Sequence, residues 1–194
     1  MRGVAILMSV VLGLLSAERA EAQCCLPGMR GVQVMGGVTD GYFEGNGGLN
    51  TGYFVGVSSA KYLKNCHKMT FGVNYLNRGF DYASERLSFE HFTFEMGYLR
   101  NLLADGGKSF FVSIGCSGVV GYEYINKGKT LLSDGARLQD EDAFIYGVSP
   151  CLELEYYLCD YVVLVASANE RIVWGGSTGH FHLQLGVGLR FIIN

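Results

Sequence analysis

The stretch FHLQLGVGLRFII, residues 181–193, decides the fold class of this chain. From Phe181 to Phe191 every second position is apolar, and the positions between hold only His, Gln, Gly and Arg. Successive side chains of a β-strand point to opposite faces, so a two-residue period places all the apolar groups on one face. The stretch therefore predicts a strand with one apolar side and one polar side.

The same alternation recurs upstream with varying clarity. Composition agrees with it, because 28 Gly, 12 Tyr and 12 Phe against only 2 Pro favour strands over long helices. We therefore expect eight strands, near residues 30–40, 53–62, 69–77, 87–99, 110–124, 143–156, 161–170 and 180–192.

Strand length and loop length indicate which solvent the apolar faces meet, since soluble sandwiches and lipocalin-like barrels alternate as well. The expected strands have about 10 to 14 residues, more than the usual five or six and enough to cross a bilayer at a tilt. Short turns on one side and long loops on the other are typical of outer-membrane barrels. The odd-numbered connections are longer or more polar than most of the even-numbered ones: 41–52, 78–86, 125–142 and 171–179 against 63–68, 100–109 and 157–160.

Backbone chemistry requires such a sheet to close. An unpaired amide costs several kcal/mol in hydrocarbon, so an open sheet edge cannot face lipid. We therefore expect an all-β protein, an eight-stranded antiparallel up-and-down outer-membrane-type β-barrel. Its last strand carries a pattern that resembles the signal read by the bacterial barrel-insertion machinery, at Gln184, Gly186, Leu189 and Phe191.

The N-terminus predicts export. A basic residue at position 2 precedes an apolar run over residues 4–15 and a polar stretch ending Ala20-Glu21-Ala22. This layout is typical of a secretory signal peptide with an A-x-A cleavage site, and the run is shorter than the roughly 20 residues of a membrane helix. We therefore expect cleavage between Ala22 and Gln23. The two parts would be a signal peptide, 1–22, and a β-barrel domain, 23–194.

Charge argues against nucleic-acid binding. The formal net charge is -3, and loss of residues 1–22 leaves it unchanged because two basic and two acidic residues are removed. Without a basic stripe to hold a phosphate backbone, direct binding of DNA or RNA is disfavoured.

The six cysteines show neither zinc-ligand spacing nor the density of a small disulfide-stapled domain. Cys116 and Cys151 fall in strand patterns, where a free cysteine behaves as a small apolar group. Cys66 and Cys159 fall in short connections that the expected topology places at the same membrane face. They are a candidate disulfide, which the geometry of the fold must decide.

The polar strand faces predict a filled interior. Eight strands leave a lumen just wide enough for side chains, so we expect no solute-conducting pore. Buried charges must pair, which predicts a plug of salt bridges. The side chains expected to point inward are Glu95, Glu123, Glu153, Glu155, Arg171, His182, Gln184 and Arg190.

Aromatic residues cluster near the expected strand ends. Tyr places its ring at the lipid boundary and its hydroxyl in water, and outer-membrane barrels carry such girdles at both interfaces. The expected girdle residues are Tyr42, Phe43, Tyr53, Tyr62, Tyr98, Tyr122, Tyr124, Tyr156, Tyr157 and Tyr161.

We predict no catalytic, cofactor or metal site, and hence no enzyme. His180 and His182 share a strand face but lack a third ligand. A lipid-modifying barrel enzyme would need a nucleophile, a base and an acid, yet no nucleophile elbow is present. The residues that could supply such a set are Ser113 or Ser117, His91 and Glu95.

Four segments resemble the TraO proteins of Bacteroidetes-type conjugative transposons. They are CLPGMRG at 25–31, FVSIG at 111–115, DAFIYG at 142–147 and HFHLQLGVGLRFIIN at 180–194. The resemblance covers essentially the whole mature chain. It implies a part of the conjugation apparatus, a type IV secretion-like system that moves transposon DNA, and it supplies no catalytic residues.

The resemblance implies a structural outer-membrane component that assembles with other conjugal transfer proteins of the secretion channel. Its turns and termini would be periplasmic and its long loops extracellular. Two alternatives stay open. One is a free-standing small barrel acting as an adhesin or envelope stabiliser, favoured by the long connection 125–142. The other is a lipid-modifying barrel enzyme.

Overall fold

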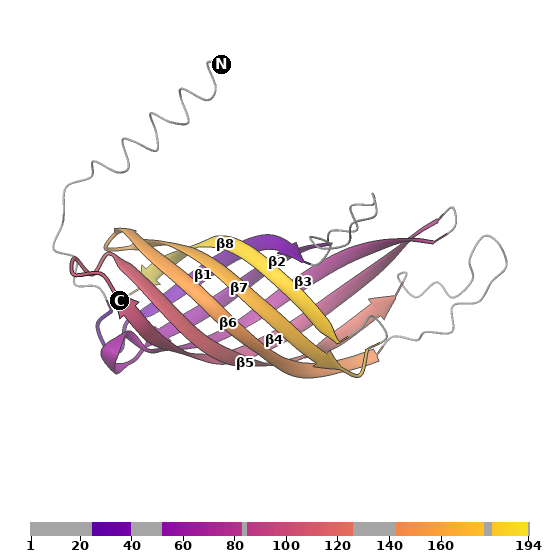
Figure 1. Ribbon diagram of the computed structural model, residues 1–194, viewed down its shortest axis with the longest axis horizontal. Helices are drawn as coiled ribbons and strands as arrows, with labels where there is room; N and C mark the ends of the chain where they lie inside the picture. Colours follow the sequence, from indigo (N-terminus) through magenta and orange to yellow (C-terminus); the bar gives the residue numbers. More distant parts are fainter. Residues whose placement is uncertain (1–24, 40–51, 83–84, 126–142, 177–179, 194) are drawn as a thin grey trace, which may run out of the picture.

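The computed structural model describes residues 25–39, 52–82, 85–125, 143–176 and 180–193. Each strand pairs antiparallel with the next, and β1 pairs with β8, which closes the sheet into a barrel (Figure 1). The predicted eight-stranded up-and-down barrel is therefore confirmed. Its elements are β1 (Arg30–Thr39), β2 (Gly52–Tyr62), the short 3-10 helix η1 (Lys64–Cys66), β3 (Lys68–Tyr82), β4 (Glu85–Ala104), β5 (Phe110–Ile125), β6 (Ala143–Cys159), β7 (Val162–Trp174) and β8 (Phe181–Ile193).

The seam between β1 and β8 is closely packed. Gly37 and Gly186 face each other in the register. A Cβ atom on Gly37 would lie 2.1 Å from the Leu185 carbonyl oxygen, and one on Gly186 would lie 2.6 Å from the Phe54 ring. Both glycines thus leave room for the seam backbone and for Phe54, which is 2% exposed inside the barrel.

Several strands run further than their apolar pattern indicates. β3 and β4 continue as a ladder to Tyr82 and Glu85, so the loop predicted over 78–86 is wrong. β4 also runs to Ala104 and β7 to Trp174, which shortens the predicted connections 100–109 and 171–179. Backbone hydrogen bonds between neighbouring strands form regardless of side-chain polarity. The apolar pattern of the sequence marks only the part of a strand whose side chains face an apolar environment.

The alternation of side chains follows the prediction. On β8, Val187 and Phe191 are 64% and 46% exposed on the outside, whereas His182 and Arg190 are buried inside. All eight strands carry large apolar side chains on the outer surface. Soluble monomers rarely expose a continuous apolar surface of this extent, so the outer face fits lipid rather than water.

Three of the short connections lie together at one end of the barrel. This terminal end holds the start of β1, the end of β8, η1, and the turns 105–109 and 160–161 (Figure 1). The remaining connections belong to the opposite, loop end. In the described ranges no helix is both long enough and apolar enough to span a bilayer.

Candidate functional site: the sealed barrel interior

A buried charge cluster crosses the barrel near its terminal end. The Lys68 ammonium lies 2.6 Å from the Glu153 carboxylate and 2.8 Å from that of Glu155. The Arg190 guanidinium lies 2.9 Å from Glu153 and also pairs with Glu155. All four side chains are at most 6% exposed. Two cations balance two carboxylates, so this Arg190 cluster is neutral as a whole.

Neutral groups complete the hydrogen bonding of the Arg190 cluster. The Tyr62 hydroxyl donates to Glu155 at 2.9 Å, and Arg190 donates through Nε to the Gln33 amide oxygen at 2.9 Å. Buried ion pairs are stable only when their remaining polar groups are also paired. These bonds and ion pairs link β1, β2, β3, β6 and β8 across the lumen.

A second group of charges lies toward the loop end. Arg171 on β7 pairs with Glu95 on β4, and His91 Nε2 lies 2.8 Å from the Glu123 carboxylate. The His91 and His182 rings meet edge to face with centroids 5.9 Å apart. The inward residues predicted from the sequence therefore do point into the lumen, and the predicted salt-bridge plug is confirmed.

A small polar cavity lies between the two charged groups. It measures about 70 Å³ and is lined mainly by Gly, Ser, Thr, Asn and Gln residues, with Glu153 on one side and Arg171 on the other. A single water needs roughly 10–15 Å³ by this measure, so the cavity has room for only a few small molecules. The interior does not form a conduit for a macromolecule.

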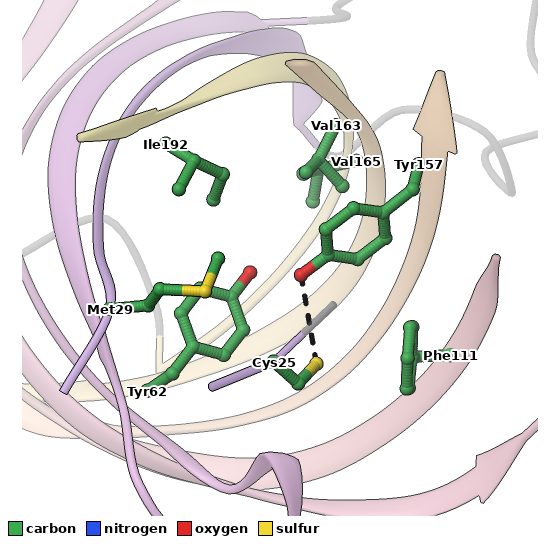
Figure 2. Close-up of a cluster of buried hydrophobic side chains, with 8 residues drawn as sticks. All are labelled: Cys25, Met29, Tyr62, Phe111, Tyr157, Val163, Val165 and Ile192. Atoms are coloured by element: carbon green, nitrogen blue, oxygen red, sulfur yellow. Dashed lines mark hydrogen bonds between the residues drawn. The ribbon is translucent and has the colours of Figure 1, made fainter. Parts of the chain in front are cut away.

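An apolar plug closes the terminal end (Figure 2). It brings together side chains from the segment before β1 and from five strands: Cys25, Met29, Tyr62, Phe111, Tyr157, Val163, Val165 and Ile192. The rings of Phe111 and Tyr157 pack edge to face with centroids 5.5 Å apart.

Two predicted girdle residues are part of this plug. Tyr62 and Tyr157 are 0% and 6% exposed inside the barrel, so their assignment to an outer girdle is wrong. Each of the two tyrosines lies next to an outward-facing position. Neighbouring residues of a strand point to opposite faces, so an error of one residue in the expected alternation assigns a side chain to the wrong face. The exposed girdle candidates are Tyr53, Tyr98, Tyr122, Tyr124, Tyr156 and Tyr161, whereas Tyr42 and Phe43 lie outside the described residues.

The residues considered for catalysis do not come together. His91 pairs with Glu123, whereas Glu95 pairs with Arg171. Glu123 faces His91 in the β4–β5 register, and Ser117 lies six residues further along β5. At about 3.4 Å per residue this is roughly 20 Å, and Ser113 is further still. These residues therefore do not form a Ser-His-acid set.

Metal-type ligands do not gather either. His180 lies 3.0 Å from the Val173 carbonyl oxygen through Nδ1, and His182 contacts His91 instead of His180. In the part of the chain that the structure describes, no group of three or more His, Cys, Asp or Glu side chains could hold a metal ion.

Comparison with known proteins assigns the family. The family model "Conjugative transposon protein TraO" matches residues 26–193. This chain belongs to the TraO family. A search of curated protein sequences returns no match.

Solved outer-membrane proteins share the fold of this TraO family member. Neisserial surface protein A superimposes with a TM-score of 0.54 at 12% identity, over 86% of this chain and 97% of that one. Ail, the attachment invasion locus protein of Yersinia pestis, gives a TM-score of 0.54 at 12% identity, over 86% and 100%. At such low identity the likeness concerns the fold alone.

Sequence reasoning missed three members of the TraO interior, Gln33, Tyr62 and Lys68. The alternation of inward and outward positions along each strand could have found each of them. Gln33 lies between the outward Val32 and Val34, and Lys68 precedes a strand whose outward residues begin at Met69. Tyr62 shares the parity of the buried Phe54 on β2.

The remaining predicted site residues of the TraO chain have different outcomes. Gln184 and Gly186 point inward, whereas Leu189 and Phe191 are 39% and 46% exposed on the outer face. Recognition of these four residues by the insertion machinery stays a prediction. The predicted cleavage site at Ala22 and Gln23 lies outside the described residues.

The cysteines of the TraO chain show no Cys66–Cys159 bridge. Both residues carry free thiols in this structure. Cys159 is exposed at the end of β6, whereas Cys66 packs against the apolar plug that contains Cys25.

Proposed function

We propose that this TraO family member is an outer-membrane structural component of the transfer apparatus of a conjugative transposon, without catalytic activity. Family membership supports the link to conjugation. The observation that carries the structural role is a closed barrel that is apolar outside and filled inside. Such a body can anchor in a membrane and bind partners.

The outer surface supports the membrane location. Val73 on β3 and Phe94 on β4 face each other in the register and are 58% and 46% exposed at mid-height of the barrel. Charged groups are paired in the lumen, as in other barrels that must keep charge out of hydrocarbon. Together with the signal peptide expected at 1–22, this supports the bacterial outer membrane, with the terminal end in the periplasm.

The filled lumen supports an anchoring role over a conducting one. A cavity of about 70 Å³ between two charged groups is far smaller than a DNA–protein substrate. Eight strands enclose too little space for such a substrate in any case. The transfer channel would therefore be built by other conjugal transfer proteins, with this barrel attached to them.

The terminal end supplies a surface for that attachment. Leu102 and Leu103 lie at the end of β4, where the pairing with β5 shifts register, and are 53% and 66% exposed. They project beyond the point where β4 pairs with the first residue of β3, on the side proposed to be periplasmic. Exposed apolar side chains at a rim suit contact with a protein partner.

Gene deletion tests the proposed role in conjugation. Transfer frequency should fall when the gene is deleted and recover with the wild-type gene. Restoration should fail with Leu102→Asn combined with Leu103→Asn, while Leu103→Met, which keeps the apolar area, should restore transfer. Unchanged transfer after deletion would remove the proposal and favour the adhesin or envelope-stabiliser alternative.

Heat-dependent gel mobility tests the location and the folding of every variant. Closed membrane barrels resist detergent unfolding until heated, so the protein in washed outer-membrane fractions should migrate faster before boiling than after. Single alanine substitutions of His91, Glu95 and Ser113 address the enzyme alternative. The enzyme alternative requires that these substitutions abolish a lipid modification while the barrel still shows the mobility shift.

A further inference from the structure

The segment before β1 folds back into the mouth of the barrel. Met29 N donates to the Leu26 carbonyl at 3.1 Å, and Gly28 between them has φ of +98°. With Pro27 before that glycine, these features mark a type II turn, which requires positive φ at its third position. The turn is fixed to β2, because Gly28 N donates to the Tyr62 carbonyl at 2.9 Å.

The turn places the Cys25 side chain inside the apolar plug. Cys25 is 6% exposed, and its Sγ lies 3.6 Å from the Tyr157 hydroxyl (Figure 2). Burial, the largest cause, and the neighbouring Cys66 side chain raise the pKa of the Cys25 thiol to about 12. Cys66 packs against the same apolar plug, so both cysteines lie at the terminal end, outside the membrane-spanning part of the strands.

The β2–β3 connection brings Cys66 to the same place. Leu63 N donates to the His67 carbonyl at 2.7 Å, which closes a tight loop. Within it Asn65 and Cys66 have φ of +59° and +57°, and Cys25 has +62°. Left-handed backbone is costly for residues other than glycine and persists only where surrounding structure imposes it. Both cysteines adopt this conformation, and both reach the apolar plug.

We propose that Cys25 and Cys66 form a disulfide that latches the N-terminal segment over the terminal mouth of the barrel. The inference goes beyond the proposed function and rests on it only for export. Disulfides form and persist in the bacterial periplasm. The bond would join the segment before β1 to the β2–β3 connection and so hold the apolar plug in place.

The oxidant is a protein disulfide of a periplasmic thiol–disulfide oxidoreductase. The thiolate of the half-exposed Cys66 attacks one sulfur of that disulfide, which forms a mixed disulfide and releases one oxidant thiolate. The Cys25 thiolate then attacks the Cys66 sulfur and releases the second oxidant thiolate. The cysteines lose two electrons and two protons, and the oxidant becomes a dithiol.

The buried position of Cys25 sets the timing of this reaction. Because the pKa of its thiol is about 12, little thiolate exists at neutral pH once the barrel has folded. The second attack should therefore be slow in the folded, reduced protein and faster as the pH rises toward 12. Rapid closure at neutral pH requires that the bond form before the plug has packed.

Peptide mass spectrometry tests the pairing. Full-length protein is taken from outer membranes with free thiols alkylated during lysis, then denatured and digested with trypsin without reductant. Cleavage after Arg30, Lys64 and Lys68 should give a linked pair that joins the peptide ending at Arg30 to Asn65-Cys66-His67-Lys68. The link should persist in Cys24→Ser and Cys159→Ser and disappear in Cys25→Ser.

Three outcomes would overturn the pairing. They are alkylated Cys66 in the wild-type protein, a Cys66 peptide linked to Cys159, and a link lost in Cys24→Ser but kept in Cys25→Ser. None of them would touch the proposed role in conjugation, because transfer frequency is measured separately.

Thermal unfolding tests the latch itself. A reductant should lower the unfolding midpoint of the wild-type and Cys24→Ser proteins by about 5–15 °C, since cross-links of this kind restrict the unfolded chain. The Cys66→Ser protein should show the lower midpoint with or without reductant. A linked peptide pair without any difference in midpoint would leave the bond but overturn its role as a latch.

Discussion

At the scale of single residues, the sequence predicts which charged side chains point into the lumen, but it does not predict which of them pair. Parity predicts that Glu153, Glu155 and Arg190 point inward. Lys68, which joins them, sits at the end of β3 before the first outward residue, Met69, so only the alternation extended back from that residue places it in the lumen. Which of the buried charges pair depends on the stagger of β3, β6 and β8 around the barrel, and no local sequence pattern contains this stagger.

Lys68→Met should destabilise the barrel by about 3–5 kcal/mol, because it leaves the buried carboxylates of Glu153 and Glu155 with one cation between them. The free energy of unfolding in urea, measured in lipid vesicles, checks the prediction. The fluorescence of Trp174, which is the single tryptophan of the sequence, reports unfolding.

Two matched variants separate loss of charge balance from loss of volume. Adding Glu153→Gln to Lys68→Met leaves Arg190 opposite Glu155 and should recover most of the lost stability. Lys61→Met, on the exposed face of β2, should change stability by less than about 0.5 kcal/mol. Equal losses in the single and the double variant would contradict the neutral cluster described above.

At the scale of the element, the sequence predicts all eight strands, while the ends of the strands and the packing of the seam do not follow from it. Hydropathy marks the apolar part of β3 and β4 and misses their polar extension. The seam between β1 and β8 depends on contacts between residues about 150 positions apart in sequence, such as Gly37 with Gly186. Only the three-dimensional register shows which glycines are crowded.

Gly37→Ala should weaken the seam by about 1–3 kcal/mol, because the new Cβ meets the Leu185 carbonyl at 2.1 Å and the β8 backbone must move. Gly36→Ala is the neighbouring control. Its Cβ would lie 3.6 Å from the nearest heavy atom, the Phe54 carbonyl oxygen, which is an ordinary contact. The folded fraction on unheated gels should fall for Gly37→Ala alone, and a similar loss in both variants would refute the crowded seam.

At the scale of the whole molecule, the barrel exchanges the places that apolar and charged side chains take in a soluble protein. Apolar side chains cover the outside, and charged side chains pair with one another inside. The sequence predicts this exchange, because alternation, strand length and the need to close the edge all point to one solvent for the apolar faces. The apolar plug could not be predicted, since its residues come from the turn before β1 and from five strands that meet only in the closed barrel.

Arginine substitutions test the exchange directly, because they report how deep a position lies in hydrocarbon. Val73→Arg, at mid-height on the outer face, should destabilise the barrel in lipid vesicles by about 2–4 kcal/mol. Leu103→Arg, on the terminal rim, should cost about 0–1 kcal/mol although Leu103 is the more exposed of the two residues. Urea titrations followed by Trp174 fluorescence give both values. If Val73→Arg were as harmless as Leu103→Arg, the outer faces of these strands would lie in water or against protein, and the membrane-embedded barrel would have to be abandoned.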